Sequence, residues 1–186
     1  MKSFDLVSYL NQGAEQLILD ILKATLRNPK EALFMRRYYN AQKEMERRRA
    51  ALEAEGLHIP MFLIASITNA CNLYCKGCYA RANGQCGSAS AKPMLGVDQW
   101  DDLFRQAEDA GIAFVLLAGG EPMMRPDVLR AAAAHEEILF PIFTNGTLID
   151  APLLQLFDRH RNLVPIVSLE GGEAATDDRR GEGAYA

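Results

Sequence analysis

Four short apolar runs alternate with helical segments along most of this chain, and no other feature constrains its fold as strongly. Each run is apolar at successive positions rather than at every second one, which is typical of strands buried on both faces. The runs cover residues 61–67, 112–117, 138–143 and 164–169. Pro141 and Pro165 lie inside two of them, and each removes a backbone donor. Strands of this kind joined by helices predict a parallel sheet with helices outside it.

The helices divide into two groups. Residues 1–57 predict a helical N-terminal extension, and residues 58–186 form the α/β core. In the extension, an amphipathic first helix is indicated by apolar residues at near-helical spacing, namely Val7, Leu10, Leu17, Ile18, Ile21 and Leu22. Pro29 suits the first turn of a second helix that ends near Gly56. In the core, helices are predicted over residues 100–111, 126–135 and 152–160. We expect the extension to pack on the core, with a membrane surface or a second copy as alternatives.

The composition excludes several classes of protein. Hydrophobic residues make up 49% of the chain and charged residues 24%. This composition excludes a mainly disordered protein, a collagen and a coiled-coil array. The net charge of −4 gives no overall reason to bind nucleic acid. No apolar run approaches the roughly 20 residues that span a bilayer, and no signal peptide is recognisable. The expectation is a cytoplasmic protein without a transmembrane segment.

The four cysteines lie within residues 71–86. Thiols this close together indicate a metal or cluster site rather than a disulfide framework. Cys71, Cys75 and Cys78 form C-x-x-x-C-x-x-C, whose thiolates can surround one metal or one face of a four-iron cluster. Three ligands would leave one iron open to an incoming molecule, whereas Cys86 as a fourth ligand would close a structural zinc site. The spacing leaves both possibilities open.

Each of the four apolar runs is followed directly by a polar or glycine-rich motif. In chain order, these are the cysteine loop, Gly119-Gly120-Glu121-Pro122, Thr144-Asn145-Gly146-Thr147 and Ser168-Leu169-Glu170-Gly171. Because the carboxyl ends of parallel strands meet at one edge of a sheet, we expect the four motifs to lie along one rim.

These motifs, in this order, resemble the radical S-adenosylmethionine (SAM) superfamily over residues 59–186. The resemblance implies a partial (β/α) TIM-like barrel with about four of six βα units present, preceded by the helical segment and incomplete at its C-terminus. It also implies that Cys71, Cys75 and Cys78 hold a [4Fe-4S] cluster whose open iron binds the methionine end of SAM. Reductive cleavage of SAM would then give a 5′-deoxyadenosyl radical that abstracts hydrogen from a substrate.

The same resemblance implies roles for individual residues. The backbone of Tyr79 would contact adenine. The two glycines Gly119 and Gly120 would let the backbone approach the methionine end, and Glu121 would accept from its ammonium; a tight strand-to-helix turn is the alternative for this motif. Thr144 and Asn145 would contact the methionine end or the ribose, and Ser168 and Glu170 would contact the ribose. Glu170 replaces an aspartate common in the family, and an ordinary Asn-Gly turn is the alternative at Asn145.

The substrate is not encoded in these motifs. A peptide or protein is our expectation, with small molecules open, and reduced ferredoxin or flavodoxin is the implied electron donor. Two alternatives remain. One is a non-catalytic zinc module whose four cysteine ligands include Cys86, and the other is a truncated, inactive fragment that binds a cluster.

Overall fold

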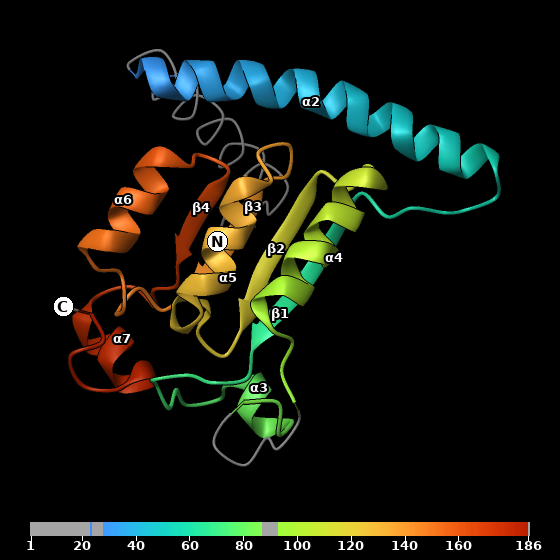
Figure 1. Ribbon diagram of the computed structural model, residues 1–186. Coiled ribbons are helices and arrows are strands. Elements are labelled where there is room, and N and C mark those ends of the chain that lie inside the picture. The colour runs from blue at the N-terminus through green and yellow to red at the C-terminus, as the bar shows by residue number, and fades with distance from the viewer. Residues whose placement is uncertain (1–22, 24–27, 87–92, 186) are drawn as a thin grey trace, which may run out of the picture. The chain divides into compact units, whose positions relative to one another are not determined.

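Four parallel strands form one sheet in the order β1-β2-β3-β4 (Figure 1). The computed structural model describes residues 23, 28–86 and 93–185. The strands are β1 (Phe62–Thr68), β2 (Phe114–Gly119), β3 (Phe140–Thr144) and β4 (Leu163–Val167). All neighbours pair in parallel, so the predicted sheet is confirmed, with strand ends displaced by one or two residues.

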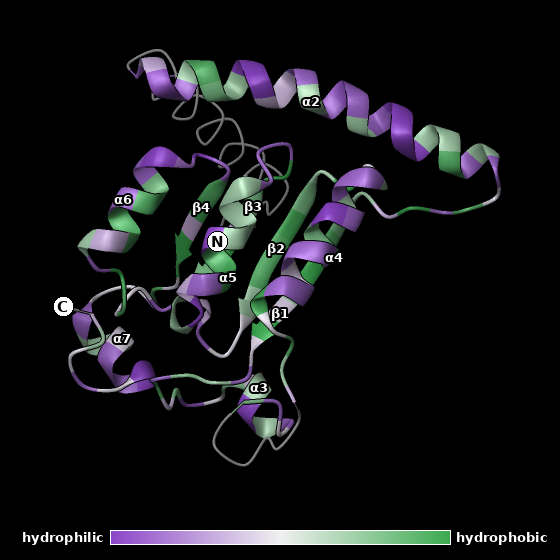
Figure 2. Cartoon of the chain, viewed as in Figure 1, coloured by the Kyte–Doolittle hydropathy of each residue, from purple (hydrophilic) through white to green (hydrophobic). Residues whose placement is uncertain are grey.

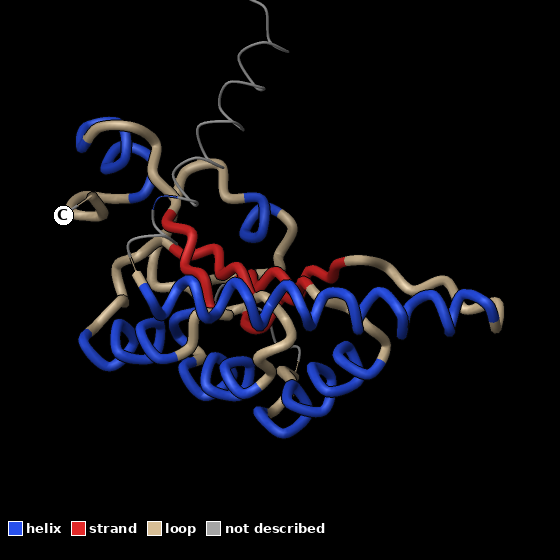
Figure 3. Tube along the Cα trace, turned by 90° about the horizontal axis from the view of Figure 1, so that it is seen from above, coloured by secondary structure: helices blue, strands red, loops and turns tan. Residues whose placement is uncertain are grey.

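The three core helices lie on one face of this sheet, as Figure 3 shows. They are α4 (Val97–Asp109), α5 (Pro126–Ala134) and α6 (Ala151–Arg159), which confirms the predicted βα alternation. Shorter elements lie in the connections beyond the strands: α3 (Tyr79–Ala82), the 3₁₀ turn η1 (Pro122–Met124) and α7 (Glu173–Arg180). The last of these, α7, is not among the helices predicted from the sequence.

The hydrophobic core lies between the sheet and these three helices. The side chains of Val115, Leu117, Ile142 and Leu163 point toward the helices and are at most 3% exposed. The strands are accordingly the most hydrophobic elements in Figure 2. Alternate positions face the other way, and that face also carries large apolar side chains, namely Phe62 (58% exposed), Ile64 (67%), Phe143 (46%) and Ile166 (42%). The described residues therefore cover one face of the sheet with helices and leave the other accessible.

The two prolines are accommodated differently. Pro165 lies in β4, an edge strand of the described sheet, where a missing donor costs little. Pro141 lies in β3, which is paired on both sides. The contact between β2 and β3 is correspondingly sparse, with partners at Phe114–Leu139 and Leu117–Ile142 on either side of Pro141.

The predicted second helix of the N-terminal segment is confirmed as α2 (Pro29–Ala54), whereas the expected first helix lies outside the described residues. The structure divides into two units between Asn40 and Ala41, so the second half of α2 belongs with the sheet. Met45, in that half, is completely buried in the core. Arg48 donates to the carbonyl oxygen of Glu108 in the last turn of α4, and Arg49 donates to the carbonyl oxygen of Gly111, just beyond that helix. None of the described helices combines the length and hydrophobicity needed to cross a membrane.

Candidate functional site at the carboxyl ends of the strands

The three cysteines of the C-x-x-x-C-x-x-C motif lie on the loop that follows β1 (Figure 1). Cys71, Cys75 and Cys78 are partly buried, Cys86 is buried, and all four thiols are free. The last cysteine of the motif precedes α3, so the loop turns back immediately after it. The donor set, three free thiols within eight residues, fits an iron–sulfur cluster by its chemistry. Among the described residues, however, no three Cys, His, Asp or Glu side chains are grouped closely enough to ligate a single metal ion.

The surroundings of Cys71 raise the pKa of its thiol. Burial is the main cause that raises its pKa, and the nearby charges of Cys86, Glu121 and Cys75 raise it further. A hydrogen bond with the backbone of Leu73 has the opposite effect. These interactions place Cys71 near both another cysteine of the motif and the carboxylate that follows β2.

The glycines after β2 pack directly against the start of the cysteine loop. Gly120 and Glu121 donate backbone hydrogen bonds of 2.8 Å to the carbonyl oxygens of Thr68 and Ala70. A Cβ atom at Gly120 would overlap the carbonyl of Ala70 and lie 3.1 Å from the Cβ of Cys71. A Cβ atom at Gly119, whose φ is 137°, would likewise overlap the backbone carbonyl of Thr68. The glycines are therefore required for the approach of the two loops.

Glu121 is a buried carboxylate, 1% exposed, at the centre of the rim. Its Oε1 accepts hydrogen bonds from the hydroxyl of Thr144 (2.7 Å) and the backbone N–H of Met123 (3.0 Å). Its Oε2 accepts from the backbone N–H of Asn145 (2.8 Å). These donors satisfy a charge whose burial would otherwise be costly, and they join the end of β2 to the end of β3.

The motif after β4 is held by the helix that follows it. Ser168 donates its backbone N–H to the carbonyl of Thr144 (3.0 Å), which brings it to the same rim. The carboxylate of Glu170 accepts hydrogen bonds from Arg180 (2.6 Å) and Arg179 (2.8 Å) of α7. The hydrogen bond from Arg180 is the main cause that lowers the pKa of Glu170, and the positive charge of Arg179 adds to it.

Two aromatic residues of the cysteine loop are exposed. Tyr79, 69% exposed, opens α3. Tyr74, 77% exposed, lies under the guanidinium of Arg81, 3.8 Å from the ring centroid, and Arg81 also donates to the carbonyl of Leu73 (2.6 Å). Arg81 thus connects α3 to the stretch between the first two cysteines.

The expected meeting of the four motifs at one rim is borne out by these contacts. The roles of the individual residues toward SAM stay predictions. Glu121, Thr144 and Asn145 form one network, whereas Glu170 is engaged with α7 and Tyr79 lies outside the network. Two residues that were not predicted from the sequence, Asn72 and Lys76, attach the cysteine loop to the turn after β3 and to α7. Their position between the cysteines of the motif was the one feature of the sequence that could have indicated a role in holding the loop.

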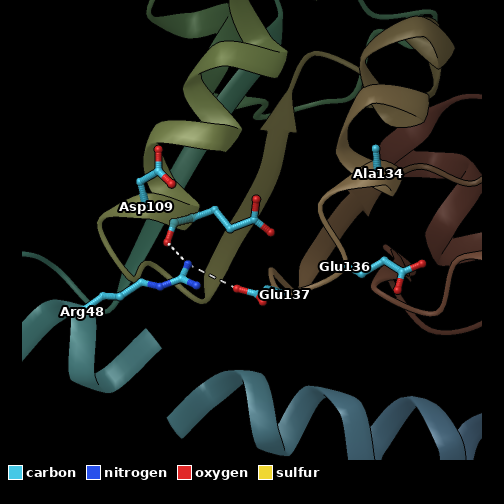
Figure 4. Close-up of a pocket in the computed structure, with 6 residues that line it drawn as sticks. Arg48, Asp109, Ala134, Glu136 and Glu137 are labelled. Atoms are coloured by element: carbon cyan, nitrogen blue, oxygen red, sulfur yellow. Dashed lines mark hydrogen bonds and ion pairs between the residues drawn. The ribbon is translucent and has the colours of Figure 1, made fainter. Parts of the chain in front are cut away.

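A pocket of about 500 Å³ lies elsewhere, among the ends of α4 and α5 that precede β2 and β3. It is lined by Arg48, Glu108, Asp109, Ala134, Glu136 and Glu137, and Figure 4 shows Arg48 reaching the carbonyl of Glu108 and the carboxylate of Glu137. These residues precede the strands, so the pocket is separate from the cysteine loop. Its arginine serves to hold α2 against the core.

Fold and site together define a four-stranded parallel α/β sheet, part of a TIM-like barrel, with a cysteine-rich site at its carboxyl edge. The family model of the radical SAM superfamily matches residues 65–186, and the chain belongs to this superfamily.

Named relatives extend well beyond the length of this chain. The PqqA peptide cyclase of Rhizobium meliloti (strain 1021) is 30% identical over 131 residues, which are 68% of this chain and 34% of that protein. The mycofactocin maturase MftC of Mycobacterium ulcerans (strain Agy99) is 31% identical over 137 residues, 70% of this chain and 35% of MftC. The crystal structure of Streptococcus suis SuiB superposes with a TM-score of 0.57 at 22% identity, covering 75% of this chain and 31% of SuiB. The chain thus spans about a third of the length of these relatives, and the likeness to SuiB supports the fold.

Proposed function

We propose that this chain binds a [4Fe-4S] cluster through Cys71, Cys75 and Cys78, binds SAM beside it, and cleaves SAM reductively. The observation that carries the proposal is the attachment of the three-cysteine loop to the glycine-rich turn after β2. When bound, the cluster would supply the electron that cleaves SAM and yields a 5′-deoxyadenosyl radical. The protein's part is to hold and orient both groups.

The residues at the carboxyl ends of the strands have hydrogen-bonding groups that can bind the methionine end of SAM. An ionised carboxylate offers about four acceptor positions, and Glu121 uses three of them within the protein. The remaining position can accept from the ammonium of SAM. Gly119 and Gly120 carry no side chain between the backbone and a bound methionine group. Thr144 holds Glu121 in place, and Asn145 presents its side chain at the same edge.

The proposal also assigns residues to the adenosine part of SAM. Tyr79 would contribute its backbone, and Ser168 and Glu170 would bind the ribose. Glu170 would accept from a ribose hydroxyl while it remains paired with Arg179 and Arg180. The substrate class we propose is a peptide or protein, as the names of the PqqA peptide cyclase and of SuiB bound to precursor peptide SuiA suggest for those relatives. Reduced ferredoxin or flavodoxin is the proposed electron donor.

A four-cysteine zinc site is a second candidate, because Cys86 is buried and close enough for its charge to raise the pKa of Cys71. The two candidates differ in what they require of Cys86. A three-cysteine cluster survives Cys86→Ala and is lost in Cys71→Ala, whereas a four-cysteine zinc site is lost in both.

The decisive experiment is anaerobic reconstitution with iron and sulfide, followed by EPR of the dithionite-reduced protein with and without SAM. We expect a [4Fe-4S]⁺ signal that changes on addition of SAM, retained in Cys86→Ala and absent in Cys71→Ala. Release of 5′-deoxyadenosine under reducing conditions would then demonstrate cleavage. Protein that takes up no iron but retains one zinc, and loses it in Cys86→Ala, would contradict the proposal.

A further inference from the structure

The side chain of Asn72, the residue directly after Cys71, bridges the cysteine loop and the turn after β3. We propose that Asn72 is a positioning residue that sets the orientation of Cys71 by binding Asn145 and Thr147. The proposal rests on the function proposed for Cys71 above, and it concerns how the protein prepares the loop for the cluster.

Both ends of the Asn72 side chain are engaged. Its Oδ1 accepts from Nδ2 of Asn145 (2.9 Å), and its Nδ2 donates to the hydroxyl of Thr147 (2.8 Å). The hydroxyl of Thr147 in turn donates to Oδ1 of Asn145 (2.8 Å). The three side chains therefore form a closed ring in which each hydrogen bond has a defined direction.

This ring is anchored to a buried part of the molecule. The backbone N–H of Asn145 donates to Glu121, and the backbone N–H of Thr147 donates to Oδ1 of Asn145 (3.0 Å). Glu121 and Thr144 are at most 2% exposed. The ring itself lies at the surface. Through Asn145, however, it is attached to the buried end of β3 and not to another surface loop.

Other contacts hold the rest of the cysteine loop. The backbone N–H of Lys76 donates to the carbonyl of Arg179 (2.7 Å), and Arg81 donates to the carbonyl of Leu73. On the other side of Cys71, the backbone N–H of Glu121 donates to the carbonyl of Ala70. Within the described contacts, Asn72 supplies the side-chain connection next to this cysteine, so loss of its two hydrogen bonds would loosen the loop at Cys71 and leave Cys86 unaffected.

The ring requires an amide rather than a carboxylate at position 72. Nδ2 donates to a hydroxyl whose own proton is already given to Asn145. In Asn72→Asp, an oxygen would face Thr147 in place of the donor, so one hydrogen bond of the ring would be lost. The acceptor for Asn145 would remain, which predicts an effect intermediate between the native protein and Asn72→Ala.

The test compares the native chain, Asn72→Ala, Asn72→Asp and, as a matched control, Asn83→Ala, an exposed asparagine at the end of α3. Iron-free protein is treated with iodoacetamide, and the modification of Cys71 and Cys86 is followed separately by peptide mass spectrometry. Asn72→Ala removes both side-chain hydrogen bonds. Since one ordinary hydrogen bond corresponds to a factor of about five, we expect alkylation of Cys71 to accelerate about 25-fold in this variant. The rate at Cys86 should be unchanged. The alkylation rate of Cys71 in Asn72→Asp should lie between those of the native chain and Asn72→Ala. In Asn83→Ala this rate should match that of the native chain.

Reconstituted protein supplies a second measurement. A chelator should remove iron about tenfold faster from Asn72→Ala, the lower range for residues that orient metal ligands, and the EPR g-values should shift. An unchanged Cys71 rate, or equal acceleration at Cys71 and Cys86, would overturn the inference. Failure of the native chain to bind iron would instead overturn the proposed function, while the alkylation rates would still decide the role of Asn72.

Discussion

The hydroxyl of Thr144, at the end of β3, donates a 2.7 Å hydrogen bond to the carboxylate of Glu121, which follows β2. Both side chains are at most 2% exposed. The resemblance to radical SAM proteins implied a contact with SAM for each of them. In the structure they are partners, so a substitution at either position changes the surroundings of the other.

The first prediction concerns Glu121→Gln, which keeps the shape of the side chain and replaces an acceptor by a donor. Because both carboxylate oxygens accept hydrogen bonds, the new NH₂ group must face an N–H or O–H donor. We expect a loss of about 1–3 kcal/mol in the free energy of unfolding, the range for an unsatisfied buried polar group. Urea denaturation measures it, with the exposed Glu55→Gln as control. Equal stability of the two variants would show that the buried network does not stabilise the rim.

The second prediction concerns the contact between the glycine turn and the cysteine loop. In Gly120→Ala the added methyl would overlap the carbonyl of Ala70, which cannot move aside as a flexible side chain would. We expect about 1–3 kcal/mol of destabilisation, as for other overpacked sites. Gly172→Ala is the matched control, since no atom lies within 4 Å of its added Cβ and its φ of −75° suits alanine. Denaturant midpoints that shift equally would contradict the steric argument.

The third prediction tests whether the second half of α2 is part of the core. Met45 is completely buried, whereas Met61 is 70% exposed. We expect Met45→Ala to cost about 2–5 kcal/mol, as typical for a buried methionine, and Met61→Ala to change the stability little. Chemical unfolding of both variants provides the comparison. A Met45→Ala variant as stable as Met61→Ala would mean that the second half of α2 does not pack on the core in solution.

The fourth prediction concerns pH. The arginines of α7 lower the pKa of Glu170 in the folded chain, so its ionised form is stabilised by folding. This contribution is fully present above the ordinary glutamate pKa of about 4.3 and is lost as the pH falls through the lowered value. The difference in unfolding free energy between the native chain and Glu170→Gln should therefore shrink as the pH falls from 7 to 3. A difference that stays constant over this range would contradict the pairing with Arg179 and Arg180.

Several of these relationships were predictable from the sequence and others were not. Continuous apolar runs such as residues 112–117 predicted strands buried in a parallel sheet. This was possible because such a run is recognised from neighbouring residues in the sequence alone. The common rim followed from topology alone. The pairing of Thr144 with Glu121 depends on side-chain directions at the ends of two strands, which no spacing in the chain encodes.

The regions that differ from expectation depend on tertiary contacts. The helix α7 was not predicted, since its residues have little hydrophobic pattern. In the structure its arginines bind Glu170, and the carbonyl of Arg179 accepts from Lys76 of the cysteine loop. Likewise, the connection of Asn72 to Asn145 joins residues on separate loops. Such contacts become visible only when the loops are placed in space.

The unequal lengths of the connections also have a consequence for the order of folding. Residues 69–113 separate β1 from β2, whereas residues 120–139 and 145–162 separate the later neighbours. Closing a longer loop costs more conformational entropy, so β1 is expected to join the sheet after β2, β3 and β4 have associated. The thiols that follow β1 would then reach the rim late, when the turns that receive them are already formed.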